Sequence, residues 1–199
     1  LSQLLASIFD AQTFKAFTRA PAAKFNHHAC IGGLLEHSLA VAKLMLTACD
    51  LYPQLSPDLA LTVALLHDLG KIHTYDPITF GKTDKGSLWE HVYMGARDVE
   101  RHIDALPDFP PELRLRVIHA ILAHQGRLEY GSPVLPMTLE AIVLHDADKL
   151  DADAQGAVDQ LSRQQGTGGA FTEHSFMHET RQTFFEERLG AAFTEIHRV

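Results

Sequence analysis

Leu65-Leu66-His67-Asp68-Leu69-Gly70-Lys71 places a histidine and an aspartate side by side at the end of an apolar segment, just before a glycine. Apolar residues from Leu59 onward recur at helical spacing, and the glycine predicts the C-terminal end of that helix. Neighbouring side chains on a helix point about 100° apart, yet both can reach an ion beyond the helix end. A carboxylate buried there needs a compensating partner such as a cation. The dipeptide alone leaves two interpretations open, a metal site or a capping aspartate beside a core histidine.

The same helical spacing continues on both sides of this segment. It predicts helices over residues 4–17, 33–50, 59–69, 88–106, 111–123 and 138–152. Ser56 followed by Pro57 is a typical helix start. Residues 76–87 and 126–136 are rich in glycine, proline and polar residues and are predicted to be loops, with room for a short hairpin in the first. Because no segment shows convincing strand alternation, the predicted fold class is all-α, a helical bundle.

Composition indicates one globular domain with a short appendage. We expect the domain to cover residues 1–165, followed by a Gly-rich linker, Gly166-Thr167-Gly168-Gly169, and a C-terminal tail to residue 199. Hydrophobic residues make up 46% of the chain, enough for a core, but no apolar run is long enough to span a membrane. Two cysteines without a CxxC pair favour a reducing compartment, and we expect a cytoplasmic protein that does not bind membranes.

The charge of the chain argues against a broad surface for nucleic acid. There are 25 acidic and 17 basic side chains, and the net charge is −8. Proteins that hold long nucleic acids need lysine and arginine to displace condensed counterions. We therefore expect contact with a few nucleotides at one site and weak binding of long RNA. A partner domain or a second subunit would have to supply a wider binding surface for long RNA.

The 13 histidines of the chain are the unusual feature of its composition. The number of histidines alone is compatible either with scattered surface histidines or with a metal site, since imidazole is the commonest protein metal ligand. Position favours the metal site, because histidine and aspartate recur on successive predicted helices: His37, His67-Asp68, His91, His124 and Asp148. Helical bundles build metal sites from such side chains on facing helices. Mixed nitrogen and oxygen ligands suit divalent Mn, Fe, Zn, Co or Mg.

The order His37, His67-Asp68, Asp148 resembles the H…HD…D signature of the HD-superfamily phosphohydrolases. Further segments resemble one branch, the bacterial 3′-to-5′ exoribonucleases of the YhaM type: PAAKFNHH (residues 21–28), GLLEHS (33–38), LYP (51–53), LHDLGK (66–71) and EYGSP (129–133). The resemblance covers residues 14–151, and more loosely the chain from Phe171 onward. It implies an all-α HD domain with a metal site in its core.

The resemblance also implies a ligand set. His37, His67, Asp68 and Asp148 would hold one divalent ion. Asp146 competes with Asp148 for the last place, but the residues around Asp148 resemble the family pattern better.

A second ion is left open by the sequence. His91 and His124 would hold it, or would contact phosphate instead. Many two-metal HD proteins have paired histidines where this chain has His124-Gln125, and an amide is a poor metal ligand. Asp151, one turn beyond Asp148, is expected to support a ligand or cap a helix.

Two residues are expected to take part in catalysis. Asp68 would bridge ions or orient the attacking water, and Lys71 would contact a substrate phosphate as a point charge. A solvated lysine that favours the helix end is an equally compatible reading of Lys71. Four residues are expected to bind substrate, and Tyr130 among them could stack on a base: Asn26, His28, Arg127 and Tyr130.

The implied reaction is hydrolysis of a phosphoester by metal-activated water. By resemblance the substrate is RNA or a short single strand, cut from its 3′ end. The charge keeps two alternatives open, a nucleotide or cyclic-nucleotide phosphohydrolase and a non-catalytic module that binds a nucleotide through its metal site. Members of the resembling branch carry an N-terminal oligonucleotide-binding domain that this sequence does not show. We therefore expect a fragment of a longer protein or a stand-alone relative, and a homo-oligomer remains open.

Overall fold

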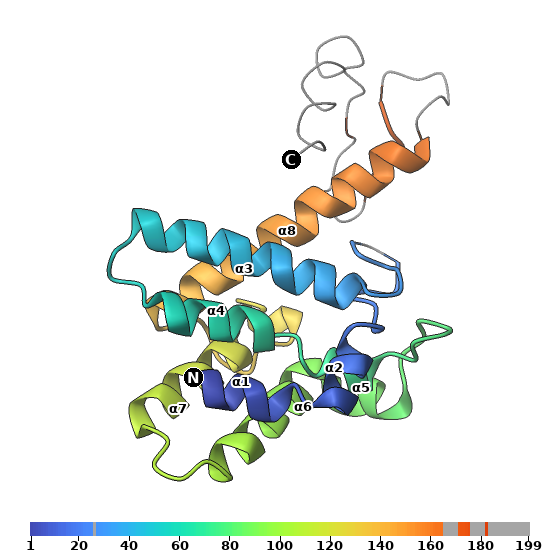
Figure 1. Ribbon diagram of the computed structural model, residues 1–199. Helices are drawn as coiled ribbons and strands as arrows, with labels where there is room; N and C mark the ends of the chain where they lie inside the picture. Colours follow the sequence, from blue (N-terminus) through green and yellow to red (C-terminus); the bar gives the residue numbers. More distant parts are fainter. Residues whose placement is uncertain (26, 165–170, 176–181, 183–199) are drawn as a thin grey trace. The chain divides into compact units, whose positions relative to one another are not determined.

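The computed structural model describes residues 1–25, 27–164, 171–175 and 182, which form helices joined by loops (Figure 1). In chain order the elements are α1 (Ser2–Ile8), α2 (Ala11–Phe17), α3 (Gly33–Leu51), α4 (Pro57–Leu66), α5 (Lys71–Thr74), α6 (Asp84–Asp104), α7 (Pro111–Ala123), the 3₁₀ helix η1 (Leu128–Tyr130) and α8 (Leu139–Gln164). The described residues contain no strand, and Tyr75 and Lys82 form one isolated antiparallel bridge. The predicted all-α class is confirmed.

The chain divides into two compact units at Ala152, and the first of them, Leu1–Ala152, carries every feature described below. The predicted domain boundary at residue 165 and the linker at 166–169 fall outside the described residues and stay predictions. None of the described helices has the length and apolar character needed to cross a membrane.

The predicted helix over residues 4–17 is wrong in one respect, because the structure forms two short helices there. The carboxylate of Asp10 accepts a hydrogen bond from the backbone N–H of Thr13 at 2.7 Å and so caps the start of α2. Between the helices, the ring of Phe9 lies edge-on to those of Phe14 and Phe17, at 6.5 and 5.1 Å between centroids. The break therefore lets both helices turn apolar side chains toward the core.

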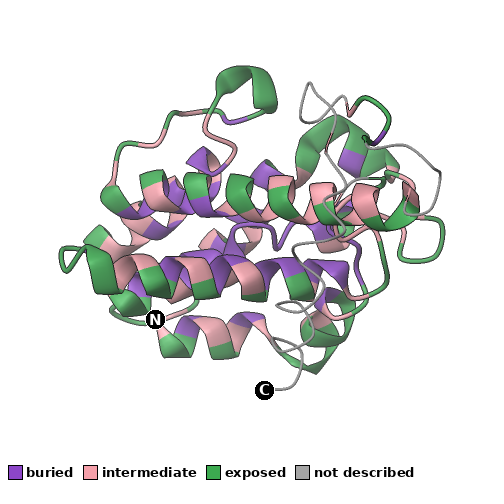
Figure 2. Ribbon diagram, turned by 90° about the horizontal axis from the view of Figure 1, so that it is seen from above, coloured by how far each residue is buried: buried purple, intermediate pink, exposed green. Residues whose placement is uncertain are grey.

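The core of the first unit lies between α3, α4, α7 and the start of α8. Buried residues follow the inward sides of these helices (Figure 2), among them Leu34, Val41, Met45, Leu59, Val63, Leu66, Val117, Ile121 and Leu144. The same inward sides carry the fully buried polar residues His37, His67, Asp68 and His124. A polar cluster is thus built into the hydrophobic core, where each charged group needs a partner.

Gly70 brings two segments of backbone into close approach. α4 ends at Leu66, earlier than predicted, and Gly70 has φ −61°, so it is not the left-handed C-terminal glycine that the sequence predicted. Space explains the glycine instead. A Cβ atom at this position would lie 2.0 Å from the carbonyl oxygen of His91 and 2.7 Å from the nitrogen of Gly95. The contact holds α6 against the segment that carries His67 and Asp68.

α6 is kinked at Glu90. The helix starts at Asp84, earlier than predicted, where the hydroxyl of Thr83 accepts a hydrogen bond from the N–H of Gly86. Glu90 has φ 58° and ψ 157°, a region that is essentially restricted to glycine. The kink separates the exposed Trp89 from His91, which is partly buried against Asp68.

The kink predicts an unusual order of stability. At an ordinary helix position alanine is more stabilising than glycine by about 1 kcal/mol. At position 90 we expect Glu90→Gly to be more stable than Glu90→Ala by about 1 kcal/mol, because only glycine adopts this backbone without strain. Both variants lose the ion pair with Lys82 alike. Urea unfolding of the two variants measures the difference.

The matched control is the same pair of substitutions at Glu100, an ordinary helical position of α6 that loses its ion pair with Arg114 in both variants. At position 100 we expect Glu100→Ala to be more stable than Glu100→Gly. The same order at both positions would show that α6 has no kink.

Candidate metal centre

The structure brings together the six candidate ligands, although they come from distant parts of the chain. α3 supplies His37, and the turn after α4 supplies His67 and Asp68. The other three come from α6, the turn after α7, and α8: His91, His124 and Asp148. Their donor atoms form two groups, each lying within 4.8 Å: one of His37, His67 and Asp148, and one of Asp68, His91 and His124. Their role as ligands stays a prediction, and their convergence is a feature of the fold.

The first group is centred on two imidazoles. The Nε2 atoms of His37 and His67 are 3.2 Å apart. Asp148 Oδ1 lies 3.1 Å from Nε2 of His37 and 3.9 Å from that of His67. The described part of the chain gives Asp146 an exposed position outside both groups, so the geometry supports Asp148 over Asp146 as the carboxylate.

The second group repeats this arrangement. The Nε2 atoms of His91 and His124 are 3.4 Å apart. The side-chain nitrogen of Gln125 lies 2.8 Å from Nε2 of His124 and 3.4 Å from that of His91. Gln125 therefore borders this group at the place where paired histidines stand in many two-metal HD proteins.

Asp68 lies between the two groups and turns one oxygen toward each. Its Oδ2 atom is 3.4 Å from Nε2 of His37 and 3.3 Å from that of His67. Its Oδ1 atom is 3.4 Å from Nε2 of His91 and 3.6 Å from that of His124. A carboxylate in this position can bridge two cations.

The charge on Asp68 is buried and stays ionised. The residue is 1% exposed, and within the described chain neither oxygen receives a hydrogen bond of good geometry, although Nζ of Lys71 is 2.5 Å from Oδ2. Burial opposes ionisation, but the positive charge of Lys71 holds the pKa of the Asp68 carboxyl well below its usual value. Two under-coordinated carboxylate oxygens in a core are what a metal ion would satisfy.

The tautomers of the histidines point to the same conclusion. Nδ1 of His67 donates to the carbonyl of Ala64 at 2.8 Å, and Nδ1 of His124 donates to that of Ile121 at 2.7 Å. A carbonyl only accepts, so Nδ1 carries a proton, and in the neutral imidazole the lone pair of Nε2 faces the cluster. Lone pairs and carboxylates that face one another repel unless a cation lies among them. The donor set therefore fits a divalent metal.

His37 is oriented from behind by Asp151. The carboxylate of Asp151 accepts a hydrogen bond from Nδ1 of His37 at 2.7 Å and another from Nε2 of His28 at 3.1 Å. Burial opposes ionisation here too, but these hydrogen bonds from His28 and His37 lower the pKa of Asp151 to about 2. Despite the burial of His37, hydrogen bonds to Asp148 and Asp151 raise its pKa well above the usual value. The pocket thus favours positive charge at this point.

We expect Asp151→Ala to weaken metal binding about 10- to 100-fold, because carboxylates behind a ligating histidine fix its orientation and basicity. Competition with a chelator of known affinity measures the change. Asp146→Ala is the matched control, since it removes an exposed carboxylate from the same helix. Equal affinities in the two variants would show that Asp151 plays no part in positioning.

Lys71 is not the solvated lysine of the alternative reading. Its side chain is packed into the first unit, with the residue 8% exposed, and it pairs with Asp68. Burial lowers the pKa of a lysine, but the charges of Asp68 and Asp148 raise the pKa of Lys71 above its usual value. Lys71 is therefore a fixed positive charge beside both groups.

The predicted substrate-binding residues are spread around the site. Asn26 lies outside the described residues, and His28 joins Asp151 as described. Arg127 and Tyr130 lie on the exposed turn around η1, with the guanidinium 5.8 Å from the centre of the Tyr130 ring. Their contact with substrate stays a prediction. The sequence reading missed a basic surface along α6, described below.

Comparison with known proteins agrees with this geometry. The HD domain family matches residues 34–153. The chain is 35% identical over 169 residues to the 3′-5′ exoribonuclease YhaM of Bacillus subtilis, covering 84% of this chain and 53% of the relative. It is 34% identical over 171 residues to the YhaM exoribonuclease of Bacillus licheniformis, covering 85% and 54%. The chain thus spans about half the length of the curated relatives it matches.

No solved structure matches the chain. The family match covers more than half of the sequence and includes all six residues of the two groups. HD domains bind divalent metals, and the donor atoms gathered here suit such ions. The chain belongs to the HD domain family.

Proposed function

We propose that the protein is a metal-dependent phosphodiesterase that removes nucleotides from the 3′ end of short single-stranded RNA. The observation that carries the proposal is the position of Asp68, which turns one oxygen toward each of two groups of imidazole and carboxylate donors. Bound divalent ions lower the pKa of water and neutralise charge on a phosphoryl oxygen. The relatives named as exoribonucleases support RNA as the substrate.

The residues of the chain have distinct roles in this proposal. Once deprotonated, the Nε2 atoms of His37, His67, His91 and His124 would hold the ions, with Asp148 completing the first group. Asp68 would hold both ions and orient the attacking water. Lys71 keeps Asp68 ionised and adds positive charge beside the phosphate.

The donor set narrows the choice of metal. Each group contains two imidazoles and one carboxylate. Imidazole suits Fe and Zn and carboxylate suits Mn, so the mixed set fits these ions, whereas Mg prefers oxygen ligands throughout. We therefore propose two first-row transition-metal ions per chain. The sequence alone predicted the ligands of one ion and left the second open.

The decisive experiment combines elemental analysis with a substrate panel. Protein supplied with Mn²⁺ is offered a generic phosphodiester, bis(p-nitrophenyl) phosphate, then cyclic nucleotides, and then oligoribonucleotides with a free or a phosphorylated 3′ end. We expect stepwise shortening of the strand with a free 3′ end. Hydrolysis of cyclic nucleotides alone would favour the alternative of a cyclic-nucleotide phosphohydrolase, which the acidic charge supports. Metal binding without turnover on any substrate would indicate a non-catalytic module.

A further inference from the structure

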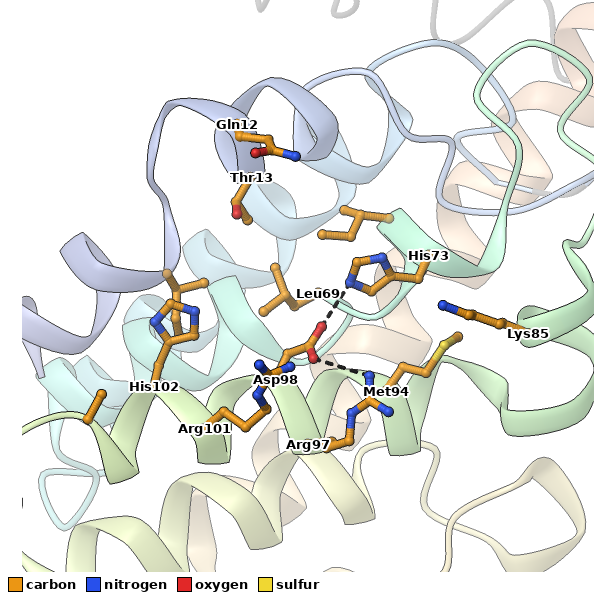
Figure 3. A pocket seen from close by; sticks show the side chains of 13 residues that line it. Gln12, Thr13, Leu69, His73, Lys85, Met94, Arg97, Asp98, Arg101 and His102 are labelled. Carbon is orange, nitrogen blue, oxygen red and sulfur yellow. Dashed lines mark hydrogen bonds and ion pairs between the residues drawn. The ribbon is translucent and has the colours of Figure 1, made fainter.

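A cleft of about 700 Å³ runs beside α6 and is lined by side chains from α1, α2, α5 and α6 (Figure 3). None of its lining residues belongs to the two metal-binding groups. Three of them are permanently cationic: Lys85, Arg97 and Arg101. His73 and His102 also line it. In a chain with a net charge of −8, such a concentration of basic side chains needs an explanation.

Little of this positive charge is neutralised from within. Asp98 is the one acidic residue in the lining, and it already accepts a hydrogen bond from His73 at 2.8 Å and lies 3.6 Å from a guanidinium nitrogen of Arg97 (Figure 3). Among the described residues, Lys85 and Arg101 form no ion pair, and both are exposed. The cleft therefore has positive charge that can bind an anion.

Two exposed aromatic residues adjoin the cleft. Trp89 is 43% and Tyr93 is 53% exposed, and their rings are in edge-to-face contact at 6.2 Å. The guanidinium of Arg97 lies 5.4 Å from the centre of the Trp89 ring and 5.8 Å from that of Tyr93. Arg97 thus joins the aromatic pair to the basic cleft, and its cation–π contacts hold the rings in place.

These residues are successive neighbours on α6, because positions four apart adjoin on a helix surface. Lys85, Trp89, Tyr93, Arg97 and Arg101 recur every four positions, interrupted only by the kink at Glu90. Before the kink the rise from Lys85 to Trp89 is about 6 Å, and after it the rise from Tyr93 to Arg101 is about 12 Å. Such a row is longer than one nucleotide. Positive charge along a groove with aromatic rings beside it is the arrangement that binds single-stranded nucleic acid without sequence preference.

We propose that this surface, the α6 cleft, binds a single strand of nucleic acid. Lys85, Arg97 and Arg101 contact its phosphates, and Trp89 and Tyr93 stack on its bases. The inference deepens the proposed function, since it rests on that function for the claim that the bound strand is the substrate. The same helix carries His91 of the second group, so a strand held along α6 is anchored to the element that helps to form the metal centre.

The alternatives explain fewer of the observations. An acidic peptide would use the three cations but would not need the stacked rings. A mononucleotide would use one cation and one ring. Three phosphate contacts correspond to a salt slope of about 2 for a single strand. This value agrees with the weak binding of long RNA that the net charge predicts.

The test is binding of the full chain, loaded with Mn²⁺, to a fluorescent 12-nucleotide oligouridylate whose phosphorothioate linkages resist hydrolysis. Anisotropy is measured from low to physiological salt. We expect Lys85→Ala and Arg101→Ala each to lower the slope of log affinity against log salt by about 0.7. Trp89→Ala is expected to weaken binding about 10-fold without changing the slope, and Trp89→Phe to restore most of the loss.

Lys43→Ala is the matched control, because it removes an exposed positive charge from α3, outside the cleft. All five variants should hydrolyse bis(p-nitrophenyl) phosphate as the unaltered protein does, and should unfold at the same temperature. Equal effects of Lys43→Ala and Arg101→Ala would overturn the proposal. So would equal losses on a dinucleotide and the 12-mer, or binding of a poly-glutamate peptide that competes with the strand and is insensitive to Trp89→Ala.

Failure of the cleft and failure of the proposed function are distinguishable. If no substrate is turned over but the 12-mer binds with the expected salt slopes, strand binding by the α6 cleft is supported and the phosphodiesterase activity is contradicted. If every cleft variant shortens RNA from its 3′ end with an unchanged KM, the phosphodiesterase activity is supported and strand binding by the α6 cleft is contradicted.

Discussion

Asp68→Asn is expected to lose metal from both groups and to lower kcat/KM for a phosphodiester at least about 10³-fold. Bound metal supplies several kcal/mol of transition-state stabilisation, and each 1.36 kcal/mol is tenfold in rate. Asparagine keeps the size of the side chain but removes the charge that faces four imidazoles. Elemental analysis of the purified variant and steady-state rates with added Mn²⁺ measure the two effects.

The control for Asp68→Asn is Asp146→Asn, which makes the same chemical change at an exposed position of α8. Circular dichroism must accompany both, because the variant leaves Lys71 buried without its partner, and breaking a buried pair costs about 3–5 kcal/mol. His67→Ala is expected to lose metal as well, with its helical content largely retained. Stoichiometric metal in folded Asp68→Asn would contradict the assignment of Asp68 as a metal ligand.

Gly70→Ala is expected to destabilise the protein by at least about 3 kcal/mol, because the new methyl group would overlap the backbone of His91 and Gly95. For a chain of this size that loss lowers the melting temperature by roughly 6–12 °C. The backbone can relieve the overlap only by moving α6 away, which carries His91 from Asp68. Metal content should therefore fall in the second group before the first.

Gly81→Ala provides the comparison for Gly70→Ala. A Cβ at position 81 would meet one atom within 4 Å, Oγ1 of Thr79 at 3.4 Å, which is an ordinary contact. We expect its stability to change by less than about 1 kcal/mol. Differential scanning calorimetry of the two variants, with metal removed, separates the packing effect from any effect of bound ions. Similar melting temperatures would show that α5 and α6 do not approach as described.

Most of the helices could be predicted from local features of the sequence. Proline at the start and a continuous apolar period placed α7 at Pro111–Ala123, and Ser56 caps α4 as its side chain indicated. The candidate ligands were also visible, because the order of His37, His67-Asp68 and Asp148 is a property of the sequence. Their convergence in space agrees with that order.

Tertiary effects produced the features that the sequence did not reveal. The strained backbone of Glu90 has no local signature, since the residue is an ordinary helix former. It lies just before the part of α6 that packs against Gly70. The row from Lys85 to Arg101 was present in the sequence at a spacing of four. It was overlooked because the net charge of the whole chain argues against a basic surface, and a sum over all residues does not show where charge gathers.

The shared carboxylate of Asp68 has a thermodynamic consequence. An ion held by His37 and His67 would draw on the same carboxylate that an ion held by His91 and His124 would use. The two binding free energies are then coupled, and coupling is reciprocal: the factor by which the first ion changes the affinity for the second equals the factor by which the second changes that for the first. A substitution at His91 should therefore alter metal affinity at His37, although the two side chains belong to different groups.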